Sequence, residues 1–334
     1  MIGALSTAYG AVAAWRRRWY ARDAARRHRL MRPVVSVGNL RVGGSGKTPI
    51  VEYIARLLHA QGERPAILTR GYARRVPLDG VTVVSDGSAV RATLDSAGDE
   101  PLMLAHALPG VIVLVGSNRY LSGCLAERTL GATVHILDDG FQHVELERDA
   151  DLLLVAEEDL TDRPMPAGGL RERVSAAATA DAALVTAGYD TAAERIGRMM
   201  AISTVFRVTR TIGAPHMITG ARESVVVPPQ SRVFVVTGIA RPDRFIADVV
   251  GAGWDVSGTM TFRDHHRFGA SDVRRIGASA KSAGSAIVLT TEKDAVRLAA
   301  CELGDLPIAS VPLIVGVEPA AAFSAWLRAR LWRQ

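Results

Sequence analysis

The sequence of 334 residues has little cysteine and no membrane-spanning apolar run. Its two cysteines, Cys124 and Cys301, lie far apart and have no cysteine or histidine at metal-ligand spacing. This excludes a disulfide framework and a cysteine-based zinc site, and it is typical of a reducing cytoplasm. The uncharged stretch 1–14 is shorter than the ~20 residues that cross a bilayer. Its arginines follow rather than precede it, so we do not expect a secretory signal.

Acidic residues are scarce in one segment, which makes its positive charge strong. The chain carries 40 Lys and Arg against 34 Asp and Glu. Eight arginines fall within residues 16–32, where Asp23 is the only acid. Such a patch attracts phosphate groups of nucleic acid, anionic lipid or a phosphorylated substrate. We do not expect nucleic acid as the partner, because no RNA-binding signature accompanies the arginines.

The segment before these arginines predicts a helix with an aromatic and apolar stripe. Five side chains share one face at steps of three and four: Leu5, Tyr9, Val12, Trp15 and Trp19. Tryptophan, tyrosine and arginine on one helix are typical of a helix that lies in a membrane interface. The alternative is a helix that packs this stripe against its own domain. The pattern alone leaves both open.

A glycine-rich loop between an apolar strand and a helix is the central feature of the chain. Residues 34–37 read as a strand, and apolar positions from residue 50 onward recur at helical spacing. Between them we expect a nucleotide-binding loop made of Arg41, Val42, Gly43, Gly44, Ser45, Gly46, Lys47 and Thr48. Backbone N–H groups of such a loop face phosphate oxygens, Lys47 adds a positive charge, and the Thr48 hydroxyl is a magnesium ligand. Arg41 stands where the usual phosphate-loop pattern has glycine.

Strands and helices alternate after this loop. The expected strands are residues 65–69, 81–85, 111–115, 134–137, 152–155 and 183–186. Because these runs are apolar throughout, they predict strands buried on both faces of a sheet. The fold class is therefore α/β, with a P-loop NTPase-like, doubly wound, mostly parallel sheet and a smaller second α/β domain.

The domain organisation follows from a change of pattern near residue 205. Residues 203–211 alternate like a half-exposed strand, and a second β/α series begins near residue 233. We expect the following division: an N-terminal basic helix (1–32), a P-loop core (33–204), a linker strand (205–214), a smaller α/β domain (215–310), and a return strand with a C-terminal helix (311–334). Residues 311–317 would pair with residues 205–208.

Two acids follow one of the apolar strands. Asp138 and Asp139 follow residues 134–137, which is the arrangement of a Walker B strand whose first acid reaches Mg²⁺ directly or through water. The sequence alone does not separate the roles of the two acids. The alternative is a pair of solvated turn acids before Gly140.

Three further motifs contain residues that could act in catalysis or ligand binding. Asp99, in Gly98-Asp99-Glu100-Pro101, is either a helix cap or a general base. His265, in Asp264-His265-His266, is either a base oriented by a carboxylate or a surface histidine. Residues 290–294 either bind a ligand or cap a helix.

Taken together, the motifs resemble the tetraacyldisaccharide 4′-kinases, the lipid A 4′-kinases of Gram-negative bacteria. The resemblance covers nearly the whole chain. It rests on residues 36–40 (SVGNL), 42–49 (VGGSGKTP), 70–72 (RGY), 98–101 (GDEP), 137–143 (LDDGFQH), 166–172 (PAGGLRE), 238–240 (GIA), 262–265 (FRDH) and 291–294 (TEKD).

The resemblance implies ATP- and Mg²⁺-dependent transfer of the γ-phosphate to the 4′-hydroxyl of a lipid A disaccharide 1-phosphate. It implies a peripheral enzyme on the cytoplasmic face of the inner membrane, bound to anionic lipid, with no obligate protein partner. The implied catalytic residues are Asp99, His265, Asp139 and Lys47. The implied metal ligands are Thr48, Asp138 and Glu100. The implied substrate-binding residues are Asn39, Arg70, Tyr72, Arg119, Gln142 and Arg171.

Two other classes of protein use the same loop. A membrane-associated switch or partitioning ATPase would act on a protein partner, but it usually has an extra lysine where this chain has Val42. A basic ATPase that binds nucleic acid would show steeply salt-dependent binding.

Overall fold

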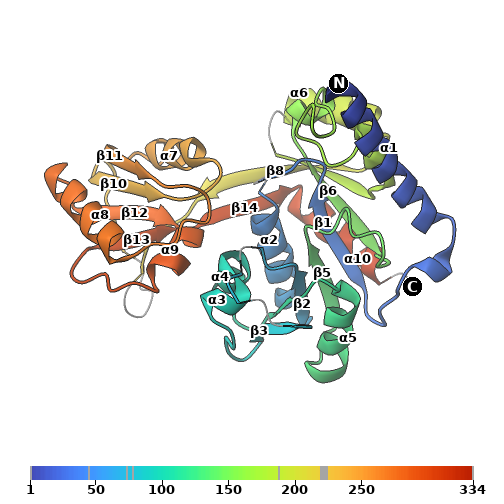
Figure 1. Ribbon diagram of the computed structural model, residues 1–334, viewed down its shortest axis with the longest axis horizontal. Coiled ribbons are helices and arrows are strands. Elements are labelled where there is room, and N and C mark those ends of the chain that lie inside the picture. The colour runs from blue at the N-terminus through green and yellow to red at the C-terminus, as the bar shows by residue number, and fades with distance from the viewer. Residues whose placement is uncertain are drawn as a thin grey trace.

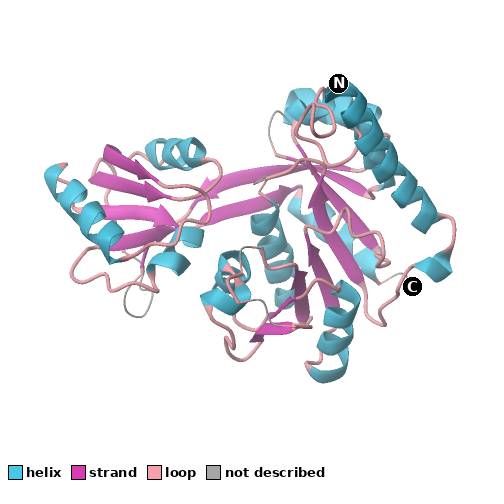
Figure 2. Ribbon diagram, viewed as in Figure 1, coloured by secondary structure: helices cyan, strands magenta, loops and turns pink. Residues whose placement is uncertain are grey.

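The computed structural model describes residues 2–43, 46–72, 74–76, 79–186, 189–218 and 225–332. Two β-sheets form two lobes, which are joined by strands β8 (Val205–Ile212) and β14 (Leu313–Glu318) (Figure 1, Figure 2). Over these ranges, no helix combines the length and the apolar character needed to cross a membrane.

The large lobe contains a nine-stranded sheet in the order β14-β8-β7-β6-β1-β5-β2-β4-β3. Its other strands are β1 (Val34–Asn39), β2 (Pro65–Thr69), β3 (Thr82–Asp86), β4 (Ile112–Val115), β5 (Val134–Asp138), β6 (Ala150–Val155) and β7 (Ala182–Val185). The pairs β3–β4 and β8–β14 are antiparallel and the other pairs are parallel. The predicted α/β class and mostly parallel sheet are confirmed.

Helices cover both faces of this sheet because its strands are apolar on both sides. Val35 and Ile67 pack on one face with helices α2, α4 and α10, whereas Val34 and Leu68 pack on the other with α5. The helices of this lobe are α1 (Ile2–Ala21), η1 (Ala24–Arg26), α2 (Lys47–Ala60), α3 (Leu94–Ala97), α4 (Asp99–Ala107), α5 (Arg119–Thr129), η2 (Glu157–Leu160), η3 (Val174–Thr179), α6 (Tyr189–Met200) and α10 (Ala320–Leu331).

The small lobe contains a five-stranded sheet in the order β11-β10-β12-β13-β9. Its elements are β9 (His216–Met217), β10 (Arg232–Thr237), α7 (Pro242–Gly251), β11 (Asp255–Thr261), α8 (Ala270–Ser282), β12 (Ile287–Thr291), α9 (Glu292–Leu298) and β13 (Ile308–Val311). Phe234, Val236 and Ile276 lie in its buried core. This lobe therefore has its own core and can present residues to the large lobe.

Strands β8 and β14 form the antiparallel connection between the lobes. Their pairing runs from Leu313 opposite Ile212 to Glu318 opposite Arg207. The ladder is longer than the sequence predicted, because it extends past residue 208 toward the small lobe. Arg210 of β8 pairs with Asp248 of α7, so the ladder is also tied to the small lobe.

The N-terminal helix α1 lies along the edge of the large lobe (Figure 1). Its inward face carries small residues. Ser6 and Gly10 are buried, and Ser6 Oγ donates a hydrogen bond of 2.6 Å to the Pro164 carbonyl. The predicted stripe faces solvent instead, with Val12 and Trp15 65% and 63% exposed. The alternative that this stripe packs on the domain is therefore wrong, because a glycine and a serine provide the closer fit.

Candidate active site

The nucleotide loop leaves β1 at Asn39 and enters α2 at Lys47. Gly46 is the N-cap residue of α2, with φ of 83°, a left-handed conformation that glycine adopts without strain. Gly46 has no side chain with which to cap this end of the helix, and the N-terminus of a helix is a favourable place for an anion. Gly44 and Ser45 lie outside the described residues. Gly43, Gly46 and Thr48 flank them at this helix end.

Lys47 is held between two polar side chains. Its Nζ atom donates a hydrogen bond of 3.0 Å to Asn39 Oδ1 and lies 3.3 Å from Asp139 Oδ1. Asn39 is buried, and its Nδ2 donor has no hydrogen-bond partner among the described residues. An unpaired buried donor beside a lysine fits an acceptor-rich ligand such as a phosphate.

Arg41 and Val42 fix the loop to a neighbouring segment. The Arg41 guanidinium lies 2.8 Å from Asp159 Oδ1 and 3.0 Å from Asp162 Oδ2. The Val42 N–H donates to the Gly169 carbonyl at 2.8 Å. The side chain of Arg41, predicted to contact nucleotide, is therefore committed to two carboxylates that anchor the start of the loop.

The two acids at the end of β5 have different environments. Asp138 is buried and accepts a hydrogen bond from Thr69 Oγ1 at 3.2 Å, so it is not a solvated turn acid. Burial, followed by the nearby charges of Glu100 and Asp139, raises the Asp138 pKa to about 7. This excess of negative charge in a buried place fits a divalent cation.

Asp139 is partly exposed and is surrounded by positive charge. Arg171 Nη1 lies 2.8 and 2.7 Å from its two carboxylate oxygens. Burial opposes ionisation, but Lys47 and Arg171 outweigh it, so the Asp139 pKa is lowered. Its φ of 54° is unusual for a residue with a side chain and shows that its surroundings hold it in place.

The predicted metal ligands Thr48, Asp138 and Glu100 do not form a closed protein cage. Across the described ranges, no three His, Cys, Asp or Glu side chains gather closely enough to hold a metal alone. Glu100 pairs with Lys293 at 3.1 Å, and its charge reaches Asp138. A site with only a few protein ligands is typical of Mg²⁺, because this ion usually keeps several waters and binds phosphates.

Asp99 and His265 meet across the two lobes. His265 Nδ1 lies 2.8 Å from Asp99 Oδ2. Asp99 is not the cap of α4, because Gly98 occupies that position. Burial opposes ionisation of Asp99, but the hydrogen bond to His265 and the nearby positive charges outweigh it, so its pKa is lowered. His265 has φ of 58°, so the second strained residue of the site lies here.

Two side chains of α9 support this pair. Lys293 belongs to residues 290–294, for which the sequence left ligand binding and helix capping open, whereas the sequence assigned Arg297 no role. Lys293 Nζ lies 3.3 Å from His265 Nε2, and Arg297 Nε lies 3.7 Å from Asp99 Oδ2. Thr291 caps α9 by accepting a hydrogen bond from the Asp294 N–H at 3.1 Å, as one sequence reading predicted. Because an ammonium only donates, His265 Nε2 accepts from Lys293, and Nδ1–H donates to Asp99. The spacing of Lys293 and Arg297 on one helix was visible, but their target on another lobe was not.

The candidate substrate-binding residues surround this acid-rich centre. Tyr72 is 73% exposed, and its ring centroid is 5.4 Å from that of His265. Arg119 is buried and donates to the Gly116 carbonyl at 3.1 Å. Burial lowers the Arg119 pKa, and the charge of Asp138 acts against this, whereas that of Arg70 adds to it.

Gln142 links β1 to the segment that carries Arg171. Its Nε2 donates to the Asn39 carbonyl at 3.0 Å, and its Oε1 accepts from Arg171 Nη1 at 3.2 Å.

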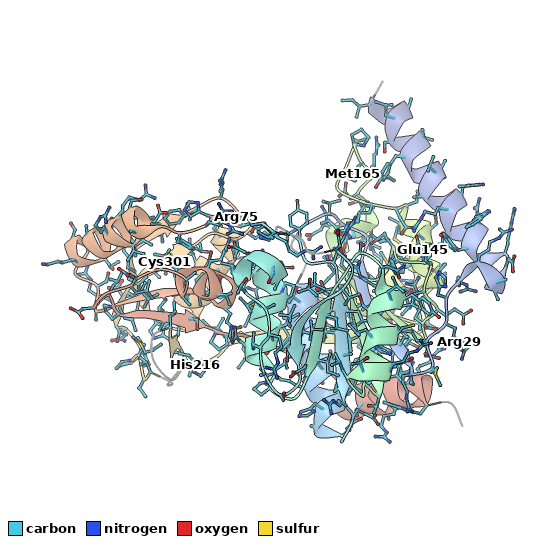
Figure 3. All side chains as sticks on the ribbon, turned by 60° about the horizontal axis from the view of Figure 1, so that its bottom comes forward. Arg29, Arg75, Glu145, Met165, His216 and Cys301 are labelled. Atoms are coloured by element: carbon cyan, nitrogen blue, oxygen red, sulfur yellow. The ribbon has the colours of Figure 1, made fainter. Side chains whose placement is uncertain are left out.

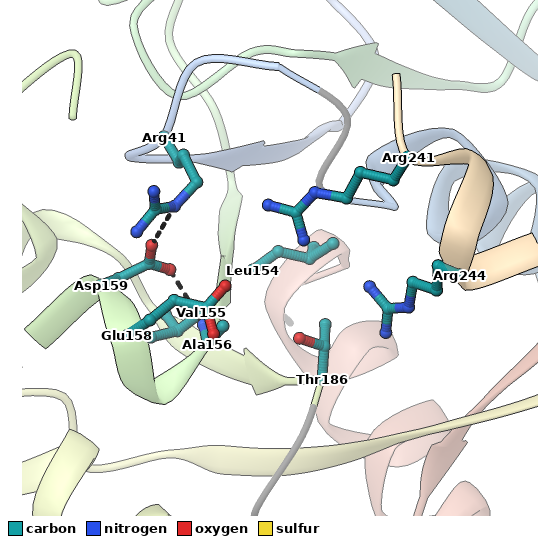
Figure 4. Close-up of a pocket in the computed structure, with 9 residues that line it drawn as sticks. All are labelled: Arg41, Leu154, Val155, Ala156, Glu158, Asp159, Thr186, Arg241 and Arg244. Atoms are coloured by element: carbon teal, nitrogen blue, oxygen red, sulfur yellow. Dashed lines mark hydrogen bonds and ion pairs between the residues drawn. The ribbon is translucent and has the colours of Figure 1, made fainter. Parts of the chain in front are cut away.

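A cavity of about 280 Å³ lies at the carboxyl ends of β6 and β7, beside the nucleotide loop (Figure 4). Arg241 and Arg244 of the small lobe face it from one side, and Asp159 with Arg41 faces it from the other. In parallel sheets, ligands bind at the carboxyl ends of the strands. The edge of this sheet therefore offers a cavity, a phosphate loop and an acid–histidine pair.

Comparisons with known proteins agree with this arrangement. The family model LpxK, tetraacyldisaccharide-1-P 4′-kinase, matches residues 1–332. A tetraacyldisaccharide 4′-kinase of Desulfotalea psychrophila is 39% identical over 306 residues, covering 88% of this chain and 86% of that protein. One of Geobacter metallireducens is 40% identical over 301 residues, covering 89% and 88%. A crystal structure of LpxK from Aquifex aeolicus in complex with ATP aligns with a TM-score of 0.79 at 30% identity, covering 98% of both chains.

Proposed function

The chain belongs to the tetraacyldisaccharide-1-phosphate 4′-kinase family, and from this premise we propose how its residues divide the work of the reaction. The enzyme transfers the γ-phosphate of ATP to the 4′-hydroxyl of tetraacyldisaccharide 1-phosphate. Family membership supports this activity over that of a partitioning ATPase. The observation that carries the residue assignment is the contact between Asp99 and His265, which come from different lobes.

ATP would bind along the carboxyl edge of the large sheet. The loop from Gly43 to Thr48 and the unpaired Nδ2 of Asn39 would receive its phosphates, with Lys47 on the γ-phosphate. The nucleoside would enter the cavity between Asp159 and Arg241. Arg41 would anchor the start of the loop through Asp159 and Asp162, and it would also line the cavity that receives the nucleoside.

Magnesium would be held by few protein oxygens. Thr48 and Asp138 are the candidates for direct contact, and Glu100 adds charge close to them. When bound, the ion would supply positive charge that neutralises the phosphates while the γ-phosphate is transferred. Asp139 would keep Lys47 and Arg171 in place, because it lies within 3.3 Å of both.

His265 would accept the proton of the 4′-hydroxyl. Its Nε2 atom carries the lone pair, and Asp99 would orient the ring and stabilise the imidazolium that forms. Lys293 donates to Nε2 in this structure, and it would donate instead to the hydroxyl or phosphate once Nε2 takes up the proton.

The core (33–204) and the smaller domain (215–310) would close on each other to exclude water, with β8 and β14 as the connection.

The acceptor would lie between Tyr72, Arg70 and Arg119 on one side and Gln142 and Arg171 on the other. Tyr72 offers an exposed aromatic face for a sugar ring, and the arginines offer charge to phosphate.

The exposed stripe of α1 would lie in the headgroup region of the inner membrane, on its cytoplasmic face. Trp15 and Val12 point outward, and Trp19 stacks with Arg26 at 4.5 Å. Aromatic rings beside arginines suit this location, where the acylated acceptor resides.

The assignment is tested by measuring transfer of labelled phosphate from ATP to the disaccharide lipid for Asp99→Ala and Lys47→Ala. Both variants should lose most of the rate. Full transfer by both, in folded protein, would contradict the proposed roles.

A further inference from the structure

The inner face of helix α1 contacts the loops that carry active-site residues. Arg17 is the main contact, and its side chain is only 11% exposed. Its Nε and Nη2 atoms donate to the two carboxylate oxygens of Glu172 at 2.9 and 2.7 Å. Its Nη2 also donates to the Phe141 carbonyl at 2.9 Å, and its guanidinium lies 4.2 Å from the Phe141 ring centroid.

Arg17 joins two segments, of which one contains Asp139 and the other contains Arg171, the partner of Asp139. Phe141 follows Asp139 by two residues, and Arg171 immediately precedes Glu172. Arg171 lies 2.7 Å from Asp139 Oδ2, so the same segments are joined a second time on the side of the active site. A movement of Glu172 relative to Phe141 would therefore change the contact between Arg171 and Asp139.

The geometry leaves little freedom at this junction. Phe141 is fully buried, and a side chain at Gly38 would come within 2.4 Å of its Cβ atom. Arg16 adds a second connection by donating to the Gln142 carbonyl at 2.8 Å and pairing with Glu145 (labelled in Figure 3). Asp139, two residues before Phe141, has a left-handed backbone conformation with φ of 54°.

We propose that Arg17 is a positioning residue for phosphoryl transfer. It joins Glu172 to the Phe141 carbonyl and thereby fixes Arg171 and Asp139 around Lys47. Helix α1 is then a working part of the catalytic site as well as a membrane-contacting element. This inference rests on the proposed role of Asp139 and Arg171.

The test compares Arg17→Ala and Arg17→Lys with Arg18→Ala. Arg18 is an exposed neighbour on the same helix, which makes it a matched control. Activity is measured in detergent micelles, where attachment to vesicles does not limit the rate. Melting temperature and ATP binding are measured on the same preparations, so that rates refer to folded protein.

We expect Arg17→Ala to lower kcat about 10- to 100-fold while KM for ATP changes less than about threefold, because misplacement of about 1 Å costs this much. Arg17→Lys should recover part of the rate, since lysine supplies the charge but not the paired hydrogen bonds. Arg18→Ala should keep kcat within about twofold.

Two results would overturn the inference. One is an unchanged kcat for Arg17→Ala. The other is a loss of rate that matches the loss of folded protein, which would indicate a structural role alone. Asp139→Asn and Arg171→Ala separate this from failure of the proposed function. If both keep the wild-type rate, the proposed roles fail; if both lose it and Arg17→Ala does not, only this inference fails.

Discussion

Asp99 and His265 are 166 positions apart in the chain, yet their side chains meet at 2.8 Å. Asp99 belongs to the large lobe and His265 to the small lobe, so the pair exists only when both lobes are in contact. Lys293 extends the contact, because it pairs with Glu100 at 3.1 Å and with His265 at 3.3 Å. The pair that we propose accepts the proton is therefore shared between the lobes.

Replacement of His265 should slow the chemical step without preventing ATP binding. We expect His265→Ala to lower kcat by about 10²- to 10⁴-fold, the range for loss of a general base. His266→Ala is the matched control, since its Nε2 pairs with Asp272 and not with Asp99. Equal rates for wild type and His265→Ala in steady-state kinetics would remove His265 from the mechanism.

The raised pKa of Asp138 predicts a pH-dependent effect on stability. The folded carboxyl has a pKa of about 7, whereas its ordinary value is 3.8, so between these pH values the folded state binds more protons than the unfolded state. For this group, stability therefore falls as pH rises through that window.

Asp138→Asn should remove this destabilisation. In magnesium-free protein we expect it to raise the melting temperature by a few degrees at pH 8, corresponding to about 1 kcal/mol or more, and by little at pH 4, close to the ordinary pKa of the carboxyl. Asp305→Asn, at an exposed loop position, should change neither value. The same difference at both pH values would show that Asp138 titrates normally. Magnesium affinity of the wild type should rise with pH through about 7.

Asp294 should be important for the stability of the small lobe. It is fully buried and accepts from the Gly238 N–H at 3.0 Å and from Thr291 Oγ1 at 2.6 Å, besides pairing with Arg297. Asp294→Ala leaves the Arg297 charge buried, and we expect it to cost about 3–5 kcal/mol of unfolding free energy. Urea unfolding with Asp305→Ala as the control measures this, and a cost below about 1 kcal/mol would contradict the network.

Trp15 should contribute to membrane binding and not to folding. It is 63% exposed, so Trp15→Ala should change the unfolding free energy by less than about 0.5 kcal/mol. Binding to vesicles that contain anionic lipid should weaken about tenfold, as expected for loss of a large interfacial side chain. Leu121→Ala removes a similarly exposed apolar side chain from α5 and is the control. Unchanged co-sedimentation of Trp15→Ala would show that the stripe does not meet the membrane.

The sequence predicts the parts of this molecule that depend on local patterns. Apolar runs such as Val34–Val37, followed by a glycine-rich loop and helical spacing, led to the α/β sheet and to the position of the loop. The stripe on α1 was also visible, but its direction was not, because that depends on the fit of Ser6 and Gly10 against Pro164 and Arg173.

Contacts between distant segments are what the sequence could not supply. The environment of Arg41 depends on Asp159 and Asp162, more than a hundred residues later. The roles of Lys293 and Arg297 depend on how the lobes meet. Resemblance to a family brought Asp99 and His265 together in advance, whereas their spacing in the chain would not have done so.

The most direct test of the account is to locate the phosphate in the reaction product. Purified protein is incubated with γ-labelled ATP, Mg²⁺ and tetraacyldisaccharide 1-phosphate, the lipid is separated by thin-layer chromatography, and the phosphorylated position is determined by ³¹P NMR. The account predicts labelled lipid with the new phosphate on the 4′-oxygen, and nearly none with Asp99→Ala. Hydrolysis of ATP without labelled lipid, or equal labelling by Asp99→Ala, would contradict it.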